Sequence, residues 1–300
     1  MDSRTHCRHL KIAKKQERIM DLPLKRPLPP NRSYEQIKNH YLVEKEIAAR
    51  LKRANRAERK EIYASMYDEL FSKVLDHPRL SIQIDVTYIT KKIRDRYEFI
   101  RRFIDNSTIF LEFAPGDCRF SIEMTRHVGF VYGIDISDQR SQIEEPPKNF
   151  KYVMYDGYDL HGVIDYDSID LVFSDQLIEH FHPEDTKLHF SLAYHLLRKG
   201  KKYIFYTPHY LTGPSDISMY FSDEPEGFHL KEWTHVELRK LLKEVGFSDI
   251  SGYIKIKGFR VRMPYLYFEL WERGLSLFPK AKMRGLAQKV IQTILIVATK

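Results

Sequence analysis

Two hydrophobic patterns divide this chain of 300 residues into helical and strand-containing parts. Short runs rich in apolar and β-branched residues predict strands, whereas apolar residues spaced three or four apart predict amphipathic helices. Strands are predicted at residues 108–113, 130–134, 150–155, 168–174, 202–206, 248–257 and 293–299. Helices are predicted at 34–52, 56–75 and 87–105, before the first strand, and as one or two helices at 263–290, before the last.

The loop after the first strand carries the clearest candidate chemistry. The strand at 108–113 is followed by the sequence Ala-Pro-Gly-Asp-Cys at 114–118, which is too small and turn-prone to continue it. Such a loop brings bare backbone close to a ligand. Asp135 closes the next strand, where a carboxylate can accept hydrogen bonds from both hydroxyls of a ribose. These features predict a site for a cofactor with an unphosphorylated ribose.

Three further dipeptides follow later strands. Asp156-Gly157 ends the third, Glu179-His180 follows the fourth, and Thr207-Pro208 ends the fifth. With the loop and Asp135, they resemble the class I S-adenosylmethionine-dependent methyltransferases, in a bacterial branch that acts on small molecules or glycans. The resemblance covers about residues 108–247 and returns at 294–300. A dinucleotide-binding dehydrogenase shares the strand, loop and acid, but it does not account for the Glu-His and Thr-Pro pairs.

The resemblance implies a fold and a cofactor site. The fold is a seven-stranded, doubly wound, Rossmann-like α/β sheet whose last strand runs antiparallel between the fifth and sixth. The cofactor is S-adenosylmethionine, and the residues implied to bind or orient it are Glu112, Ala114, Pro115, Gly116, Asp117, Asp135, Ile136, Asp156, Gly157, Tyr158, Ser174 and Gln176. Among them, Asp156 matches the position that meets the adenine amino group, and Ser174 and Gln176 would line the route to the sulfonium. Cys118 departs from the family pattern, so its side chain must turn away from the ligand.

Methyl transfer from a sulfonium is an in-line displacement, and alignment supplies much of its catalysis. A base is required when the acceptor is a hydroxyl. His180 is the first candidate, because it follows the fourth strand and imidazole suits general-base work. Glu179 would orient the substrate or pair with His180, and His229 is expected at the same rim, as are His182 and His209.

A second resemblance concerns residues 176–180 and 228–234, which are similar to the metal site of small-RNA 2'-O-methyltransferases. Gln176 replaces the first glutamate of that pattern and removes one anionic ligand, which disfavours a hard cation. We therefore expect no metal, and an acceptor hydroxyl on a small molecule or glycan. Two alternatives stay open: a metal-assisted RNA 2'-O-methyltransferase, and a cofactor-binding interaction protein without turnover.

The chain is predicted to have three parts. Residues 1–33 form a basic arm with prolines in its second half, expected to be poorly ordered. Residues 34–105 form an N-terminal helical cap, and residues 106–300 form the S-adenosylmethionine-binding domain, with 263–290 as a helical insertion. The long loop at 210–230 is expected to be functional, because long loops in compact domains usually are.

Charge changes the expected partners. The net charge of +8 comes from the ends, with +6 in residues 1–32 and +8 in 251–300, which leaves −6 in between. A nucleic-acid enzyme more often places positive charge around its active site, so nucleic acid is a disfavoured substrate. The basic ends leave peripheral membrane contact open. The two cysteines build no disulfide framework, and no signal or membrane-spanning run is evident, so we expect a cytoplasmic protein. The sequence predicts no oligomeric state.

Overall fold

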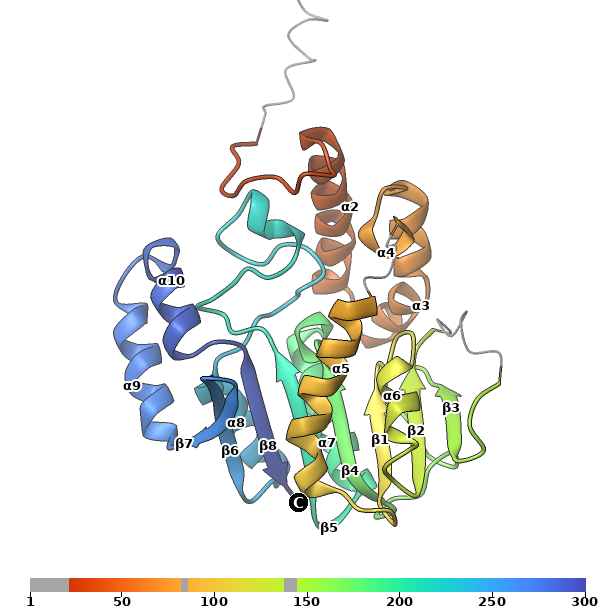
Figure 1. Ribbon diagram of the computed structural model, residues 1–300. Coiled ribbons are helices and arrows are strands. Elements are labelled where there is room, and N and C mark those ends of the chain that lie inside the picture. The colour runs from red at the N-terminus through yellow and green to blue at the C-terminus, as the bar shows by residue number, and fades with distance from the viewer. Residues whose placement is uncertain (1–21, 82–85, 138–144) are drawn as a thin grey trace, which may run out of the picture.

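Eight strands form one mixed sheet in the computed structural model, which describes residues 22–81, 86–137 and 145–300. Their order is β3-β2-β1-β4-β5-β8-β6-β7 (Figure 1). The strands are β1 (Ile109–Phe113), β2 (Phe130–Asp135), β3 (Phe150–Met154), β4 (Ile169–Asp175), β5 (Leu197–Thr207), β6 (Ile250–Ile256), β7 (Phe259–Met263) and β8 (Ile294–Thr299). β1 to β5 pair in parallel, and β8 runs antiparallel between β5 and β6, as predicted.

The predicted number of seven strands is wrong, because β7 adds an eighth at the edge of the sheet. β6 and β7 form a hairpin across Lys257 and Gly258, whose φ angles are both positive, at 49° and 92°. A two-residue turn of this kind suits the twist of a hairpin but usually carries Asn-Gly or Asp-Gly. β7 is also an exposed edge strand that contains Arg260 and Arg262, so it lacks an apolar run that would reveal it.

Helices cover both faces of the sheet and the carboxyl ends of its parallel strands (Figure 1). α5 and α6 lie in front of the sheet in this view, α7 and α8 lie behind it, α2 to α4 lie above it, and α9 and α10 lie beside β6 and β7. Their bounds are α2 (Tyr34–Arg53), α3 (Arg56–Lys73), α4 (Pro78–Ser81), α5 (Val86–Ile100), α6 (Arg119–Met124), α7 (Pro183–Leu196), α8 (His235–Val245), α9 (Tyr265–Ser276) and α10 (Lys280–Val290). Short 3-10 helices are η1 (Arg101–Phe103), η2 (Ile178–His180) and η3 (Ile217–Tyr220).

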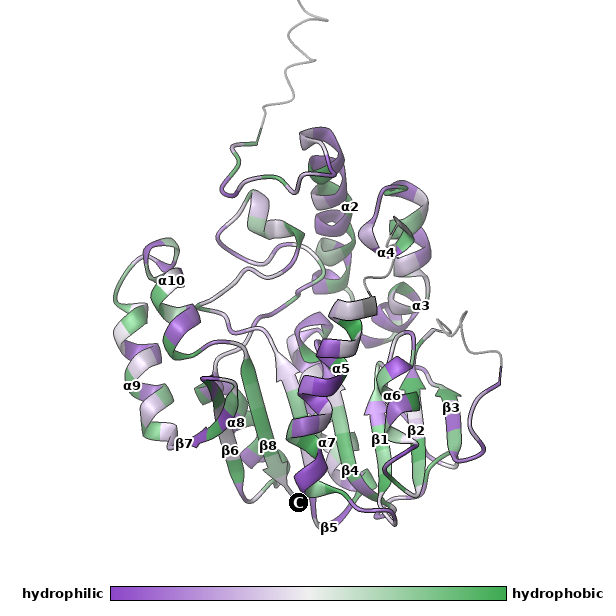
Figure 2. Ribbon diagram, viewed as in Figure 1, coloured by the Kyte–Doolittle hydropathy of each residue, from purple (hydrophilic) through white to green (hydrophobic). Residues whose placement is uncertain are grey.

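The central strands are hydrophobic along most of their length, because both of their faces are buried (Figure 2). In β5, Tyr203 and Phe205 join the core under α7 and α8, whereas Ile204 and Tyr206 join the core under α5 and α6. The sheet therefore holds its helices through two separate apolar layers. Among the described residues, no helix combines the length and apolar character that crossing a membrane requires.

The predicted N-terminal helices pack in two different places. Residues of α2 and α3 form a core with Phe228 and Leu230 of the loop between β5 and α8. In contrast, Phe99 and Ile100 of α5 belong to the sheet core. α2 and α3 therefore cover the carboxyl ends of the strands, whereas α5 is part of the sheet's own helical layer.

The second half of the predicted basic arm, residues 22–33, packs against α2 and the loop between β5 and α8. The Lys25 amide donates a 2.8 Å hydrogen bond to the Tyr220 carbonyl, and Leu22 and Leu28 pack on the core formed by Ile37, Tyr41 and Phe221. The proline-rich composition of this segment does not reveal that Leu22 and Leu28 contact a core. Residues 1–21 lie outside the described residues.

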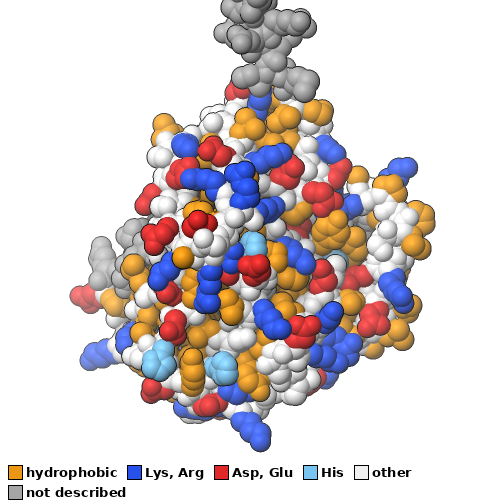
Figure 3. Space-filling model, turned by 180° about the vertical axis from the view of Figure 1, so that it is seen from behind, with side chains coloured by type: hydrophobic (Ala, Val, Ile, Leu, Met, Phe, Trp, Pro, Cys, Tyr) orange, Lys and Arg blue, Asp and Glu red, His pale blue; other side chains and the backbone are white. Residues whose placement is uncertain are grey.

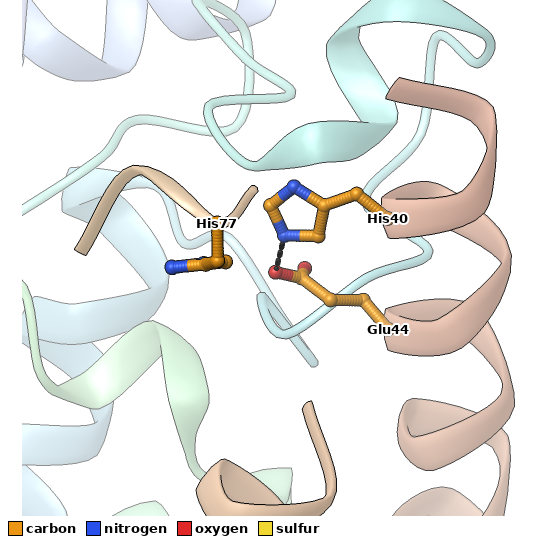
Figure 4. Close-up of side chains that lie close together, drawn as sticks. All are labelled: His40, Glu44 and His77. Atoms are coloured by element: carbon orange, nitrogen blue, oxygen red, sulfur yellow. Dashed lines mark hydrogen bonds and ion pairs between the residues drawn. The ribbon is translucent and has the colours of Figure 1, made fainter. Parts of the chain in front are cut away.

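A buried polar chain joins α2 to the loop that it covers, and Figure 4 shows its central pair, His40 and Glu44. Arg32 donates to His40 Nδ1 at 3.0 Å, and His40 Nε2 donates to Glu44 Oε1 at 2.7 Å. Glu44 Oε2 accepts the Phe228 amide at 3.0 Å. The His77 ring packs edge-on against His40 with the ring centres 4.7 Å apart. Arg32 and Glu44 thus bond both ring nitrogens of His40, and Glu44 links α2 to the Phe228 backbone.

Buried histidines predict a loss of stability in acid. Burial lowers the pKa of His189 to about 3 and of His235 to about 4, whereas an unfolded histidine titrates near 6.5. The unfolded chain therefore takes up protons first, and stability present above pH 6.5 is lost as the pH falls toward 4. Each group contributes a slope of up to about 1.4 kcal/mol per pH unit. We expect a lower free energy of unfolding at pH 5 than at pH 7 in urea denaturation. His189→Gln should reduce this slope, and substitution of the exposed His161 should leave it unchanged.

Candidate active site

A cavity of about 260 Å³ lies where the carboxyl ends of β1, β2 and β4 meet the covering helices. The chain leaves β1 with β2 on one side and β4 on the other, and ligands bind in α/β sheets at such a switch point. Its walls include Ala114, Gly116, Asp135, Ile136, Gly157, Tyr158, Gln176 and His180 from the predicted site. The cavity therefore collects predicted residues from four separate loops.

The loop after β1 is held in a left-handed conformation. The φ angles are 52° at Ala114, 57° at Gly116 and 60° at Cys118. Such values cost about 1 kcal/mol or more at a residue other than glycine, and strain of this kind concentrates at ligand sites. Cys118 is fully buried in the sheet core, so its side chain turns away from the cavity as required. Pro115 and Asp117 are in the loop but do not line the cavity.

Asp135 connects this loop to the cavity. Its side chain is 6% exposed, with Oδ1 accepting the Ile136 amide at 2.7 Å and Oδ2 accepting the Gly116 amide at 3.3 Å. Burial raises the pKa of Asp135, and the backbone donors oppose this rise. The carboxylate is thus fixed at the cavity wall, where its remaining lone pairs can accept hydrogen bonds.

Asp156 does not line the cavity, although its neighbours Gly157 and Tyr158 do. Its carboxylate accepts Lys60 Nζ at 2.9 Å and caps the turn that follows it. Asp185 of α7 lines the cavity instead. Arg59 of α3 holds Asp185 through two bonds of 2.7 and 2.8 Å, and Tyr158 Oη donates to it at 3.1 Å. The buried acid at this end of the cavity is therefore one that sequence reasoning missed.

Ser174 and Glu112 support the site from behind. Ser174 Oγ lies 2.7 Å from Tyr203 Oη in the core, and the next residue, Asp175, lines the cavity. Successive strand side chains point to opposite faces, so this offset of one residue reverses the direction of the side chain. Glu112 is buried and accepts Ser121 Oγ of α6, and burial raises its pKa to about 7. It anchors the helix that follows the loop.

The three predicted catalytic side chains come together. Glu179, His180 and His229 each offer a ligand atom within 4.8 Å of the others, and His180 lines the cavity. His180 Nδ1 donates to the Phe228 carbonyl at 3.0 Å, which leaves Nε2 as an acceptor. His229 Nδ1 donates to Glu232 at 2.8 Å. Glu179 Oε2 accepts Thr207 Oγ1 at 2.9 Å, whereas its buried Oε1 has no hydrogen-bond partner among the described residues.

Protonation differs among these three groups. Burial and then the neighbouring His229 lower the pKa of His180 to about 3, so it is neutral at pH 7. Burial raises the pKa of Glu179 to about 7. His229 is buried too, but its hydrogen bond to Glu232 and the nearby Glu179 and Asp216 raise its pKa to about 9. The neutral imidazole of His180 at the cavity wall thus contacts the charged imidazole of His229.

His182 and His209 lie elsewhere. His182 caps the start of α7 through Nδ1, which accepts the Glu184 amide at 3.4 Å. His209 is fully buried and bonds Glu272 at 2.9 Å, and the same carboxylate caps the start of α8 at His235. Neither His182 nor His209 lines the cavity or joins the cluster of Glu179, His180 and His229, so the expectation of a shared rim is wrong for these two.

A family model of the methyltransferase domain matches residues 111–205, which span β1 to β5 and the cavity's main loops. Residues 111–205 therefore form a methyltransferase domain. The fold is shared with a possible exported protein from Bordetella parapertussis, at 11% identity over 91% of this chain and 99% of that one, with a TM-score of 0.50. A methyltransferase from Archaeoglobus fulgidus is similar at 17% identity over 72% of this chain and 100% of that one, with a TM-score of 0.47. A comparison with curated proteins found no match.

The residues of this methyltransferase fit S-adenosylmethionine. Asp135 presents an anchored carboxylate for ribose hydroxyls. Gly116 has a positive φ angle, and the space where its Cβ would lie is open. Ile136, Leu177 and Phe181 supply apolar wall that suits an adenine ring. The cavity thus offers the polar and apolar surfaces that the two halves of a nucleoside require.

Proposed function

We propose that this methyltransferase transfers the methyl group to a hydroxyl of a small molecule or glycan. The observation that carries the proposal is the neutral imidazole of His180, which faces the cavity with Nε2 free to accept a proton. A hydroxyl requires such an acceptor, because its proton must leave as the oxygen gains the methyl group. S-adenosylmethionine would supply the methyl group from its sulfonium, because the neutral thioether that remains is a good leaving group.

The covering helices support an acceptor of limited size. Tyr63, Met66 and Tyr67 of α3 line the cavity together with Arg79 of α4. The Tyr63 hydroxyl accepts the His182 amide at 3.1 Å, which ties α3 to the segment that carries His180. An acceptor must therefore enter between the cap and the sheet, where a compact hydroxyl-bearing group fits more readily than a folded chain.

The proposed step follows from this arrangement. S-adenosylmethionine held by Asp135 and the loop after β1 would supply the methyl group, and His180 Nε2 would take the hydroxyl proton, which becomes strongly acidic as the oxygen gains that group even though the pKa of His180 is low. The Phe228 carbonyl holds the ring through Nδ1 and stabilises the imidazolium that forms. Because the Phe228 amide is itself bound by Glu44 of α2, the cap helps to place this base.

A second candidate is a metal-assisted RNA 2'-O-methyltransferase, which the unpartnered Glu179 Oε1 favours. His180 and His229 each have one ring nitrogen fixed by a second group, as metal-binding histidines usually do. Gln176 lines the cavity, and its neutral amide adds no anionic ligand. The face seen in Figure 3 carries interspersed acidic and basic side chains, without the continuous basic surface that RNA would favour.

Labelled methyl transfer from S-adenosylmethionine into a fractionated lysate distinguishes these functions. We expect nuclease-resistant label in a small-molecule or glycan fraction, unaffected by a chelator and absent with Asp135→Asn. Label that is sensitive to both nuclease and chelator would establish the second candidate instead. Absence of label above the Asp135→Asn control in every fraction would contradict both.

A further inference from the structure

A second cavity, of about 270 Å³, adjoins the first. The two share Lys92, Asp175 and Gln176 at their boundary. The second cavity lies among α5, the end of β5, the β6–β7 hairpin and the residues before β8. A molecule with its reactive group in the first cavity can therefore extend into the second.

Positive charge exceeds negative charge around the second cavity. Its walls contain the cations Lys92, Arg96, Lys255 and Arg260 but only the carboxylates of Asp95 and Asp175. Lys255 and Arg260 both pair with Asp95. Arg96 and Lys92 both pair with Asp175, and Lys92 Nζ lies 3.5 Å from its carboxylate. Each carboxylate thus serves two cations.

The electrostatics of Lys92 agree with this excess. Burial and the neighbouring Arg96 lower the pKa of Lys92, as expected where like charges lack enough counter-charge. A bound anion would relieve this repulsion.

Two buried donor atoms also belong to residues that line this cavity. Tyr206 at the end of β5 is 7% exposed, and its Oη has no hydrogen-bond partner among the described residues. Burial raises the pKa of Tyr206 to about 12, so the hydroxyl keeps its proton and can donate. Arg260 Nε is likewise buried and unpartnered among the described residues. The Arg260 guanidinium lies beside the Tyr206 ring and lowers the pKa of its hydroxyl, so the two side chains form one donor group that a bound anion would satisfy.

We propose that the second cavity binds an anionic group of the methyl acceptor, of the phosphate or carboxylate class, through Arg260, Lys255 and Tyr206. The inference rests on the proposed function, because it places the acceptor hydroxyl in the first cavity beside His180. The cofactor's own carboxylate is the other source of such an anion. Lys255 and Arg260 line only the second cavity, whereas the cofactor loop lines only the first, which favours the acceptor.

The first test titrates inorganic phosphate into the full-length protein by calorimetry at low ionic strength. Arg260→Gln removes a charge from the cavity. Arg262→Gln is its matched control, because Arg262 lies on the same strand but pairs with Asp249 away from this cavity. We expect phosphate to bind the wild type and Arg262→Gln alike, and Arg260→Gln at least about tenfold more weakly. Equal binding by both variants, or no binding by the wild type, would overturn the proposal.

Two further readouts separate the sources of the anion. S-adenosylmethionine affinity should be the same in Arg260→Gln and Arg262→Gln, and a selective loss in Arg260→Gln would assign the anion to the cofactor and overturn the proposal. The labelled product of the wild type should bind an anion exchanger, and a neutral product would refute an anionic acceptor while leaving methyl transfer intact. If no product forms, the proposed function fails, and the phosphate titration still decides whether the cavity binds an anion.

Discussion

Asp135→Asn is expected to weaken S-adenosylmethionine binding by about 100-fold or more. The carboxylate already accepts the amides of Gly116, Ile136 and Ser137, and each further hydrogen bond that it accepts from a ribose hydroxyl is worth about 1.5–3 kcal/mol. Asparagine keeps one oxygen for the backbone amide of Ile136 but loses the acceptor of the Gly116 amide, so the expected loss includes this link to the cofactor loop. Calorimetric titration of the cofactor into the folded variant measures the loss.

Asp156→Asn is the matched control. Asp156 also follows a strand of the same sheet, but its carboxylate pairs with Lys60 outside the cavity wall. We expect this variant to bind the cofactor within a few-fold of the wild type. Normal binding by Asp135→Asn would remove Asp135 from the cofactor site, whereas an equal loss in both variants would show that Asp156 contacts the adenine after all.

The sequence predicted the buried strands of the sheet correctly but missed the strand at its edge. Apolar strands such as β4 and β8 are buried on both faces, so their composition alone reveals them. β7 was not predicted because an exposed edge strand needs no apolar run. Its turn also uses Lys-Gly in place of the usual Asn-Gly or Asp-Gly. The packing of residues 22–33 escaped because it depends on contacts with distant residues such as Tyr220.

Site residues followed the same rule. Asp135 ends β2, Gln176 directly follows β4 and His180 lies in the short segment after β4, so all three were found because strand ends meet at one edge of a parallel sheet. Asp185 and Lys92 were missed because their local pattern is that of solvated helix charges. Only tertiary structure brings Arg59 to Asp185, across 126 residues of chain.

The cap and the catalytic group are linked by one short segment. The Phe228 amide donates a hydrogen bond to Glu44, and the Phe228 carbonyl accepts one from His180. The same segment carries His229, whose Nδ1 is fixed by Glu232. Both histidines therefore depend for their orientation on the long loop between β5 and α8, which explains why a loop of this length is packed so tightly under α2.

His180→Ala is expected to lower kcat by about 100-fold or more and to leave S-adenosylmethionine affinity within a few-fold of the wild type. A general base typically contributes 10²–10⁴ to the rate, and His180 is the imidazole of the cluster that lines the cavity. Single-turnover assays with the acceptor found in the lysate measure the chemical step, and calorimetry measures cofactor binding.

His182→Ala provides the control for this substitution. It removes an imidazole only two residues away that caps α7 and lies outside the cavity wall, so any shared loss of stability should appear in both variants. We expect His182→Ala to turn over nearly as fast as the wild type, since a weakened helix cap costs about 1 kcal/mol of stability and no catalytic group. Unchanged turnover in His180→Ala would exclude it as the base. Equal losses in both variants would instead indicate that the segment's shape, and not the imidazole at its cavity end, governs the rate.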